Sequence, residues 1–80
     1  MSEGENVYLT ELGFRVRVGR MRRRLSQEEL AQLAGIPRVT LGSIERGEHA
    51  ATVLTYRKLA QAFGVTLTAL MEEEPHVRRR

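Results

Sequence analysis

The stretch SQEELAQLAGIPRVTLGSIERG, residues 26–47, constrains the fold most, because it holds two short helical segments with a turn of only about three residues between them. Ser26 and Glu29 have the spacing of a capping box, in which each side chain accepts a hydrogen bond from the other residue's amide. Gly35 can take the left-handed conformation that ends a helix, and Pro37 has the fixed φ of a first helical turn. Two helices joined this tightly must cross at a steep angle.

Apolar residues at helical spacing predict three further helices. Over residues 8–23 one apolar stripe is formed by Leu9, Leu12, Val16 and Gly19, whereas Val18 and Met21 lie off it and could contact a neighbouring element. A second amphipathic segment covers residues 53–63, and Thr66 can cap a last short helix. The sequence has no segment between hairpin turns in which apolar and polar residues alternate, as they would in a β-strand. We therefore predict an all-α fold of five short helices around one core.

We expect a single domain over residues 1–80. Residues 1–7 are polar and patternless and are predicted to form a flexible arm, residues 8–74 a helical core, and residues 75–80 a basic tail. Eighty residues are close to the size at which a single core becomes marginal, so contact with a partner could add stability.

The composition excludes several classes of protein. The chain has no cysteine, which excludes disulfides and thiolate metal sites and favours a cytoplasmic protein. Its apolar runs are too short to cross a membrane, and its first residues lack the basic and apolar regions of a signal peptide. The two histidines, His49 and His76, are far apart, and no activated nucleophile or phosphate-binding glycine loop is recognisable. We therefore expect neither an enzyme nor a bound cofactor or metal.

The basic residues are unevenly distributed. Six arginines fall within residues 15–24 with no acid among them, three more end the chain at residues 78–80, and acids gather at residues 72–74. Such asymmetry suggests an anionic partner for one face. A solvated helix face and a frayed basic tail explain the charges equally well.

The second helix of the tight pair has an outward face that suits the major groove of DNA. Leu41 and Ile44 turn inward together, and the outward positions are small or polar with an arginine near each end: Arg38, Val39, Gly42, Ser43 and Arg46. Arg38 can donate two hydrogen bonds to guanine, or it can contact a phosphate. Val39 can meet a thymine methyl or be half buried, and Ser43 can bond a base or a phosphate. The amides at the start of the preceding helix, near Gln27, could bind a phosphate.

Three segments, in this order and spacing, carry a resemblance to a known family: SQEELAQLAGI, LGSIERG and YRKLAQAFGVTLTAL. Through them the sequence resembles the phage-repressor (Cro-like) helix-turn-helix family, also called the xenobiotic-response-element family of bacterial regulators. The resemblance covers roughly residues 12–71 and implies a lambda-repressor-like fold with a helix-turn-helix at about residues 26–46. It implies a phosphate contact for Gln27 and Arg46, base reading by Arg38, Val39 and Ser43, a backbone contact for Thr40, and an ion pair between Arg20 and Glu45. The alternative for that pair is two exposed charges worth about 0–1 kcal/mol.

The sequence departs from the family pattern at several positions. Arg24 stands where a turn glycine is common, and Gly19 replaces a large apolar residue, which predicts a thinner core there. Gly42 on the outward face loosens its helix but lets the backbone approach the groove. The loop after Gly47 has Ala50 and Ala51 in place of the usual asparagine–proline and lacks a basic residue, which weakens the expectation of phosphate contacts by this loop.

The resemblance implies a sequence-specific regulator that binds double-stranded DNA. One helix reads too few bases for useful specificity, so we expect a homodimeric repressor on a palindromic operator with half-sites about one helical turn apart. The apolar residues that we expect to serve self-association lie near the last helix: Val65, Leu67, Leu70, Met71 and Val77. The alternative is an antitoxin or another protein-interaction module on the same fold, with a toxin or the transcription machinery as its partner. Its tail or its arm would then become ordered on that partner.

Overall fold

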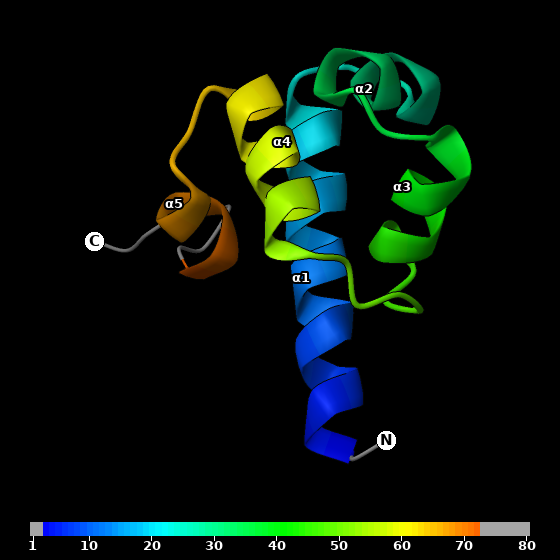
Figure 1. Ribbon diagram of the computed structural model, residues 1–80, viewed down its shortest axis with the longest axis vertical. Helices are drawn as coiled ribbons and strands as arrows, with labels where there is room; N and C mark the ends of the chain where they lie inside the picture. The colour runs from blue at the N-terminus through cyan, green and yellow to red at the C-terminus, as the bar shows by residue number, and fades with distance from the viewer. Residues whose placement is uncertain (1–2, 73–80) are drawn as a thin grey trace.

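The computed structural model describes residues 3–72, and within that range the chain forms five α-helices and no strand. They are α1 (Glu3–Arg22), α2 (Gln27–Ala34), α3 (Arg38–Glu45), α4 (Val53–Phe63) and α5 (Leu67–Glu72). The long α1 is the axis of the molecule, α2 and α3 lie on one side of it, and α4 and α5 lie on the other (Figure 1). The predicted all-α fold of five helices is confirmed.

The start of the chain differs from the expected flexible arm. Helix α1 begins at Glu3, so the backbone of residues 3–7 is helical. The first turns of α1 extend past the other helices (Figure 1). Polar residues without an apolar stripe gave no signal for a helix, yet they can continue one that the packed part of α1 has already nucleated, because adding a residue to an existing helix is far easier than starting one. The expected basic tail, residues 75–80, lies outside the described residues.

Local hydrogen bonds explain where most helices begin and end. Ser26 Oγ accepts from the Glu29 amide at 3.0 Å while the Glu29 carboxylate accepts from the Ser26 amide at 2.8 Å, so the predicted capping box is present. Thr66 caps α5 as expected, accepting from the Ala69 amide at 3.0 Å. Thr52 caps α4 in the same way, a role that the sequence analysis missed. Gly35 ends α2 in the left-handed conformation.

One hydrophobic core joins all five helices. It lies around α1 and α4 and reaches from the tight α2–α3 pair to α5. The most deeply buried large side chains are Leu30, Leu41, Ile44, Leu59 and Val16. The inward turn predicted for Leu41 and Ile44 is confirmed. No helix in the described part of the chain has the length and apolar character that spanning a membrane requires.

The core is not thinner at Gly19. The ring of Phe63 occupies the space beside this glycine, and a Cβ added there would lie 2.8 Å from Phe63 Cε2. Gly13 has a similar role against the end of α3, because a Cβ there would lie 2.8 Å from the carbonyl oxygen of Glu45 and would also meet the carbonyl of Ile44. Glycines on α1 therefore let an aromatic ring and a helix end approach its backbone closely.

The apolar residues that we expected to serve self-association are mostly used by this chain's own core. Leu70 is buried, and Leu67 and Met71 are half buried against the same core. Val65 remains exposed, and Val77 lies outside the described residues. The expectation is wrong for Leu70, because a short helix needs its apolar side to dock on the domain. For Val65, Leu67 and Met71 it stays a prediction.

Arg24 is strained, and replacing it should stabilise the protein. It has a φ of 56°, in the left-handed region that favours glycine. Arg24→Gly should raise the free energy of unfolding by about 1 kcal/mol, which corresponds to a rise in Tm of about 4–8 °C for a domain of this size. Thermal unfolding followed by circular dichroism measures it.

Arg22→Gly is the matched control. Arg22 lies in the last turn of α1 with a helical backbone, so glycine there should lower stability by up to about 1 kcal/mol. Equal destabilisation by both substitutions would show that the left-handed backbone at Arg24 carries no strain.

Candidate nucleic-acid interface

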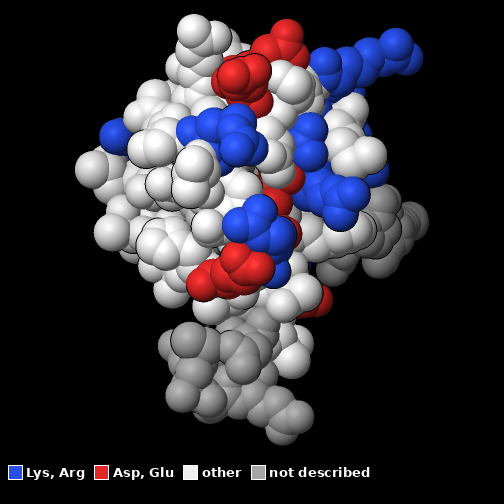
Figure 2. Space-filling view, turned by 90° about the vertical axis from the view of Figure 1, so that its right-hand side faces the viewer, with Lys and Arg blue, Asp and Glu red and all other residues white. Residues whose placement is uncertain are grey.

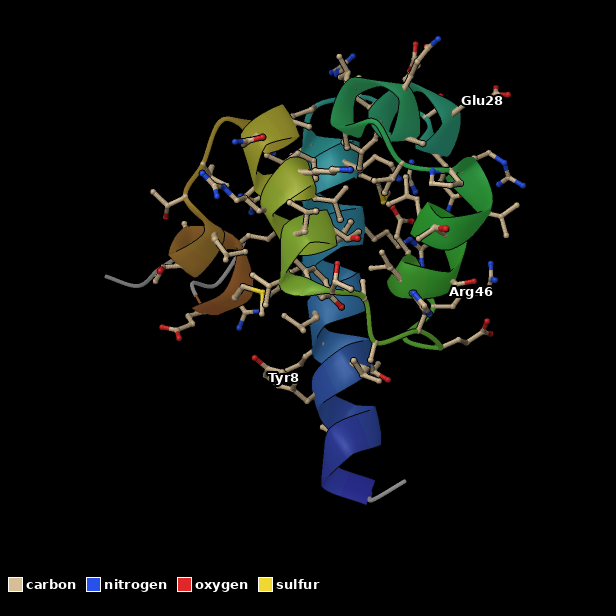
Figure 3. The ribbon with its side chains drawn as sticks, in the orientation of Figure 1. Tyr8, Glu28 and Arg46 are labelled. Atoms are coloured by element: carbon tan, nitrogen blue, oxygen red, sulfur yellow. The ribbon has the colours of Figure 1, made fainter. Side chains whose placement is uncertain are left out.

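The face formed by α3 and the start of α2 carries the predicted site residues. Arg38, Val39 and Arg46 are exposed, Val39 at 68%. Thr40 and Ser43 are half buried. Arg46 projects away from the core at the C-terminal end of α3, and Glu28 projects into solvent from the start of α2 (Figure 3). On this side of the molecule basic side chains lie in several groups, with acidic side chains between them (Figure 2).

The ion pair between Arg20 and Glu45 joins α1 to the end of α3. Arg20 Nε donates to Glu45 Oε2 at 2.8 Å, and Arg20 Nη2 donates to Glu45 Oε1 at 3.1 Å. The remaining terminal nitrogen, Nη1, donates to the carbonyl of Leu25 at 2.9 Å, just before α2. The side chains are only 15% and 3% exposed, so the pair is screened far less than a surface pair would be. One guanidinium thus ties together α1, α3 and the entry to α2.

The same carboxylate orients Gln27. Gln27 Nε2 donates to Glu45 Oε1 at 3.0 Å. A carboxylate only accepts hydrogen bonds, so the amide nitrogen must face Glu45 and the amide oxygen must face the other way. That oxygen accepts from Arg38 Nη1 at 3.1 Å. A continuous chain of hydrogen bonds therefore runs from Arg20 through Glu45 and Gln27 to Arg38, which we call the Arg20–Arg38 network.

Gly42 lies beneath other side chains of this face, whereas we expected it to be open to the groove. It is buried, and a Cβ added to it would lie 3.2 Å from Arg46 Nη1 and 3.8 Å from Gln27 Oε1. Gly42 was expected to be exposed because it lies on the outward side of α3. A long arginine side chain can, however, fold back over a glycine and cover it. The absent Cβ lets the Arg46 guanidinium lie against α3.

Arg46 is held only by weak contacts at the surface. Its Nε lies 3.1 Å from Glu48 Oε1, with both side chains more than half exposed, and its Nη2 donates to Ser43 Oγ at 3.4 Å. An exposed pair of this kind is worth about 0–1 kcal/mol. The guanidinium can therefore leave Glu48 for a stronger anion with little loss.

The arginine-rich segment is divided between structural and surface roles. Arg23 donates to the carbonyls of Gly19 and Phe63 at 2.8 and 2.9 Å, and its guanidinium lies 4.4 Å from the centre of the Phe63 ring. Arg23 thus links the C-terminal end of α4 to α1. Sequence reasoning missed this role because it depends on a contact between residues forty positions apart. Arg20 and Arg23 are therefore structural.

The face can bind an anionic, grooved ligand. Arg38 and Arg46 stand at opposite ends of α3, and the backbone amides at the start of α2 give a partial positive charge. Gln27 keeps one amide proton beyond the proton that it donates to Glu45. Opposing this, Glu28 and Glu29 occupy the first turn of α2 and would repel a phosphate placed directly over it. Among the described residues no cluster of three or more potential metal ligands occurs.

The family model described as "Helix-turn-helix" (HTH_3) matches residues 16–70 of the chain. Among curated proteins, the chain is similar to the control protein C.SmaI of Serratia marcescens, with 38% identity over 50 residues. That alignment takes in 62% of this chain and 60% of C.SmaI, so the chain spans less than two thirds of the relative that it matches.

Solved structures show the same arrangement. The restriction-modification controller protein C.AhdI from Aeromonas hydrophila is 37% identical, with a TM-score of 0.75 over 78% of this chain and 94% of that one. An HTH_3 family transcriptional regulator from Vibrio cholerae is 30% identical, with a TM-score of 0.80 over 89% of this chain and 40% of that one. The hypothetical transcription factor NHTF from Neisseria is 30% identical, with a TM-score of 0.77 over 84% and 77%.

The Arg20–Arg38 network yields a stability prediction. Glu45→Ala leaves the guanidinium of Arg20 nearly buried and without its carboxylate, so the free energy of unfolding should fall by about 3 kcal/mol. Glu48→Ala removes only the exposed partner of Arg46 and should cost less than about 1 kcal/mol. Urea unfolding of both variants measures the difference, and equal losses would contradict the structural role of Glu45.

Proposed function

The chain belongs to the helix-turn-helix family of transcription regulators, and from this premise we propose that it binds double-stranded DNA in a sequence-specific manner with α3 in the major groove. The observation that carries the proposal is the outward face of α3. This face presents Arg38 and Val39 in the open, and the helix behind them is fixed to α1 and α2 by the Arg20–Arg38 network. A rigid helix with exposed donors and one apolar side chain suits reading base edges.

Each residue of the face has a distinct proposed role. Arg38 donates two hydrogen bonds to O6 and N7 of a guanine. Its guanidinium either leaves Gln27 to do so or keeps its hydrogen bond to Gln27 through one nitrogen. Val39 contacts a thymine methyl, and Ser43 bonds a neighbouring base. Arg46 exchanges Glu48 for a phosphate. Gln27 uses its second amide proton on a phosphate, and Thr40 contacts the DNA backbone.

Dimerisation completes the proposal. An α3 of eight residues reads only a few base pairs, which gives too little discrimination among genomic sites. A two-fold pair would read a palindromic operator with half-sites about one helical turn apart. Sedimentation at tens of micromolar tests this directly, and a monomer under those conditions would contradict the homodimer.

The biological role that the relatives suggest is the control of restriction–modification genes, with repression as one mode. C.SmaI is a control protein and C.AhdI a restriction-modification controller, both above one third identity to this chain. The role is tested by selecting bound sequences from a randomised duplex library at two salt concentrations. A palindromic motif found upstream of a methyltransferase or endonuclease gene would support it. Binding without a motif, lost at moderate salt, would contradict sequence-specific reading.

Arg38 should determine the base at one position of each half-site. Arg38→Ala should lower affinity for the selected operator by about 1–3 kcal/mol and relax the choice of base at that position, with little change on random DNA. Fluorescence anisotropy with operator variants measures both. An equal loss on operator and random DNA would show that Arg38 contacts only the backbone.

Arg46 should behave as a phosphate contact. Arg46→Ala should weaken binding to operator and random DNA alike and should lower the salt slope by about one for each protomer. Arg57→Ala is the control, because Arg57 is an exposed arginine on α4, outside the α2–α3 face. A salt slope unchanged in the Arg46 variant, or lowered as much by the control, would contradict the assignment.

A further inference from the structure

Helix α1 has two apolar faces, and only one of them packs in the core. Leu9, Leu12 and Val16 are buried against the other helices. Val7, Phe14 and Met21 are 60%, 53% and 57% exposed. Each helical residue turns the chain by about 100°, so Phe14 lies about 160° around the helix from both Leu12 and Val16. The exposed residues therefore form a separate stripe on the outer side of α1.

The spacing of this stripe is that of a coiled-coil seam. Val7, Phe14 and Met21 are separated by seven residues each, and Glu11 and Val18 fill the intermediate positions, so the intervals alternate between four and three. Val18 is half buried and Glu11 is the one polar member. An alternation of four and three is the pattern of positions that contact a partner helix. From Val7 to Met21 the stripe is about 21 Å long. We call these five positions the outer seam.

Neither the core nor the proposed DNA contact accounts for the outer seam. The core stripe of α1 holds α3, α4 and α5, and the DNA-facing residues come from α2 and α3. Single exposed apolar residues such as Leu33 need no explanation, but an ordered row of them marks an interaction surface. The N-terminal part of the seam also lies where α1 extends past the other helices, so a partner helix can approach it (Figure 1).

The charges beside the seam identify the kind of partner. Arg17 flanks it on one side and Arg22 on the other, and both are exposed. A second copy of this chain packed in parallel would place arginines against arginines, which disfavours that form of self-association through this face. Acidic side chains at the flanking positions of a partner helix would complement Arg17 and Arg22.

We propose that the outer seam of α1 is the docking site for an amphipathic helix of another protein, apolar along its seam and acidic along its flanks. The partner's apolar residues pack between Val7, Phe14 and Met21, and its carboxylates pair with Arg17 and Arg22. This surface is independent of the α2–α3 face, so a protein and an operator can bind at the same time. The proposal goes beyond DNA binding and does not depend on it.

A designed peptide tests the docking site. The probe is a fluorescent helix of about three heptads with leucine at a and d and glutamate at e and g, because glutamates on both flanks prevent it from pairing with itself. A matched peptide carries lysine at e and g. Anisotropy with the full chain should show binding of the acidic peptide at tens of micromolar and at least about tenfold weaker binding of the basic one.

Three variants locate the binding. Phe14→Glu should weaken the binding of the acidic peptide at least about tenfold. Leu33→Glu, a change at an exposed apolar residue of α2, should leave that affinity unaltered. The double variant Arg17→Glu with Arg22→Glu should reverse the preference and bind the basic peptide. Unchanged thermal unfolding establishes that each variant is folded, and unchanged operator affinity of the Phe14 variant separates this surface from the DNA-binding face.

Three results would overturn the proposal. The first is no binding of the acidic peptide at a hundred micromolar, or equal binding by the Phe14 variant. The second is self-association of the chain that Phe14→Glu abolishes, which would make a second copy the occupant. The third is co-sedimentation with phosphatidylserine vesicles that Phe14→Glu abolishes in the absence of peptide binding, which would make the seam a lipid-binding face.

Discussion

The carboxylate of Glu45 is the contact on which the geometry of the α2–α3 face depends. It accepts two hydrogen bonds from Arg20 and one from Gln27, and its side chain is only 3% exposed. Three donors from two other helices therefore converge on one buried anion at the end of α3. Because that anion cannot donate, it also determines which way the Gln27 amide points, and hence that an acceptor faces Arg38. A structural ion pair thus fixes the orientation of the Gln27 side chain on the outward face, an arrangement that suits the proposed reading of a base by Arg38.

This arrangement is possible because α1 comes unusually close to its neighbours. Gly13 meets the carbonyls that end α3, and Gly47, in the left-handed conformation, lies against Thr10, where an added Cβ would be 2.8 Å from the Thr10 Cα. Side chains at these positions would push α3 away from α1 and move Glu45 out of reach of Arg20. On the other side of α1, Gly19 admits the Phe63 ring, over which Arg23 lies. Small residues that weaken α1 as an isolated helix are therefore the residues that let it organise the domain.

The sequence predicted well the features that depend on neighbouring residues. The Ser26 capping box, the end of α2 at Gly35 and the inward turn of Leu41 and Ile44 each follow from residues within a turn or two of one another. The sequence failed where distant residues decide. The burial of Gly42, the docking of Leu70 and the role of Arg23 depend on which side chain folds over which helix, and the start of α1 at Glu3 depends on a helix that is stabilised farther along. The contacts of Gln27 and Arg38 with DNA stay predictions.

The division of the arginines has a consequence for how the protein would hold DNA. The run from Arg15 to Arg24 suggested one basic surface, but the helical period distributes it: Arg20 and Arg23 serve the fold, and Arg17 and Arg22 flank the outer seam. The α2–α3 face is left with Arg38 and Arg46 as its exposed cations, and Glu28 and Glu29 lie beside them. Each protomer can then release few counterions, so its affinity for random DNA should be modest. Under the proposed mode of binding, a two-fold pair on one operator would supply the further phosphate contacts, and the apolar outer seam, with its own flanking charges, would stay available for a different partner.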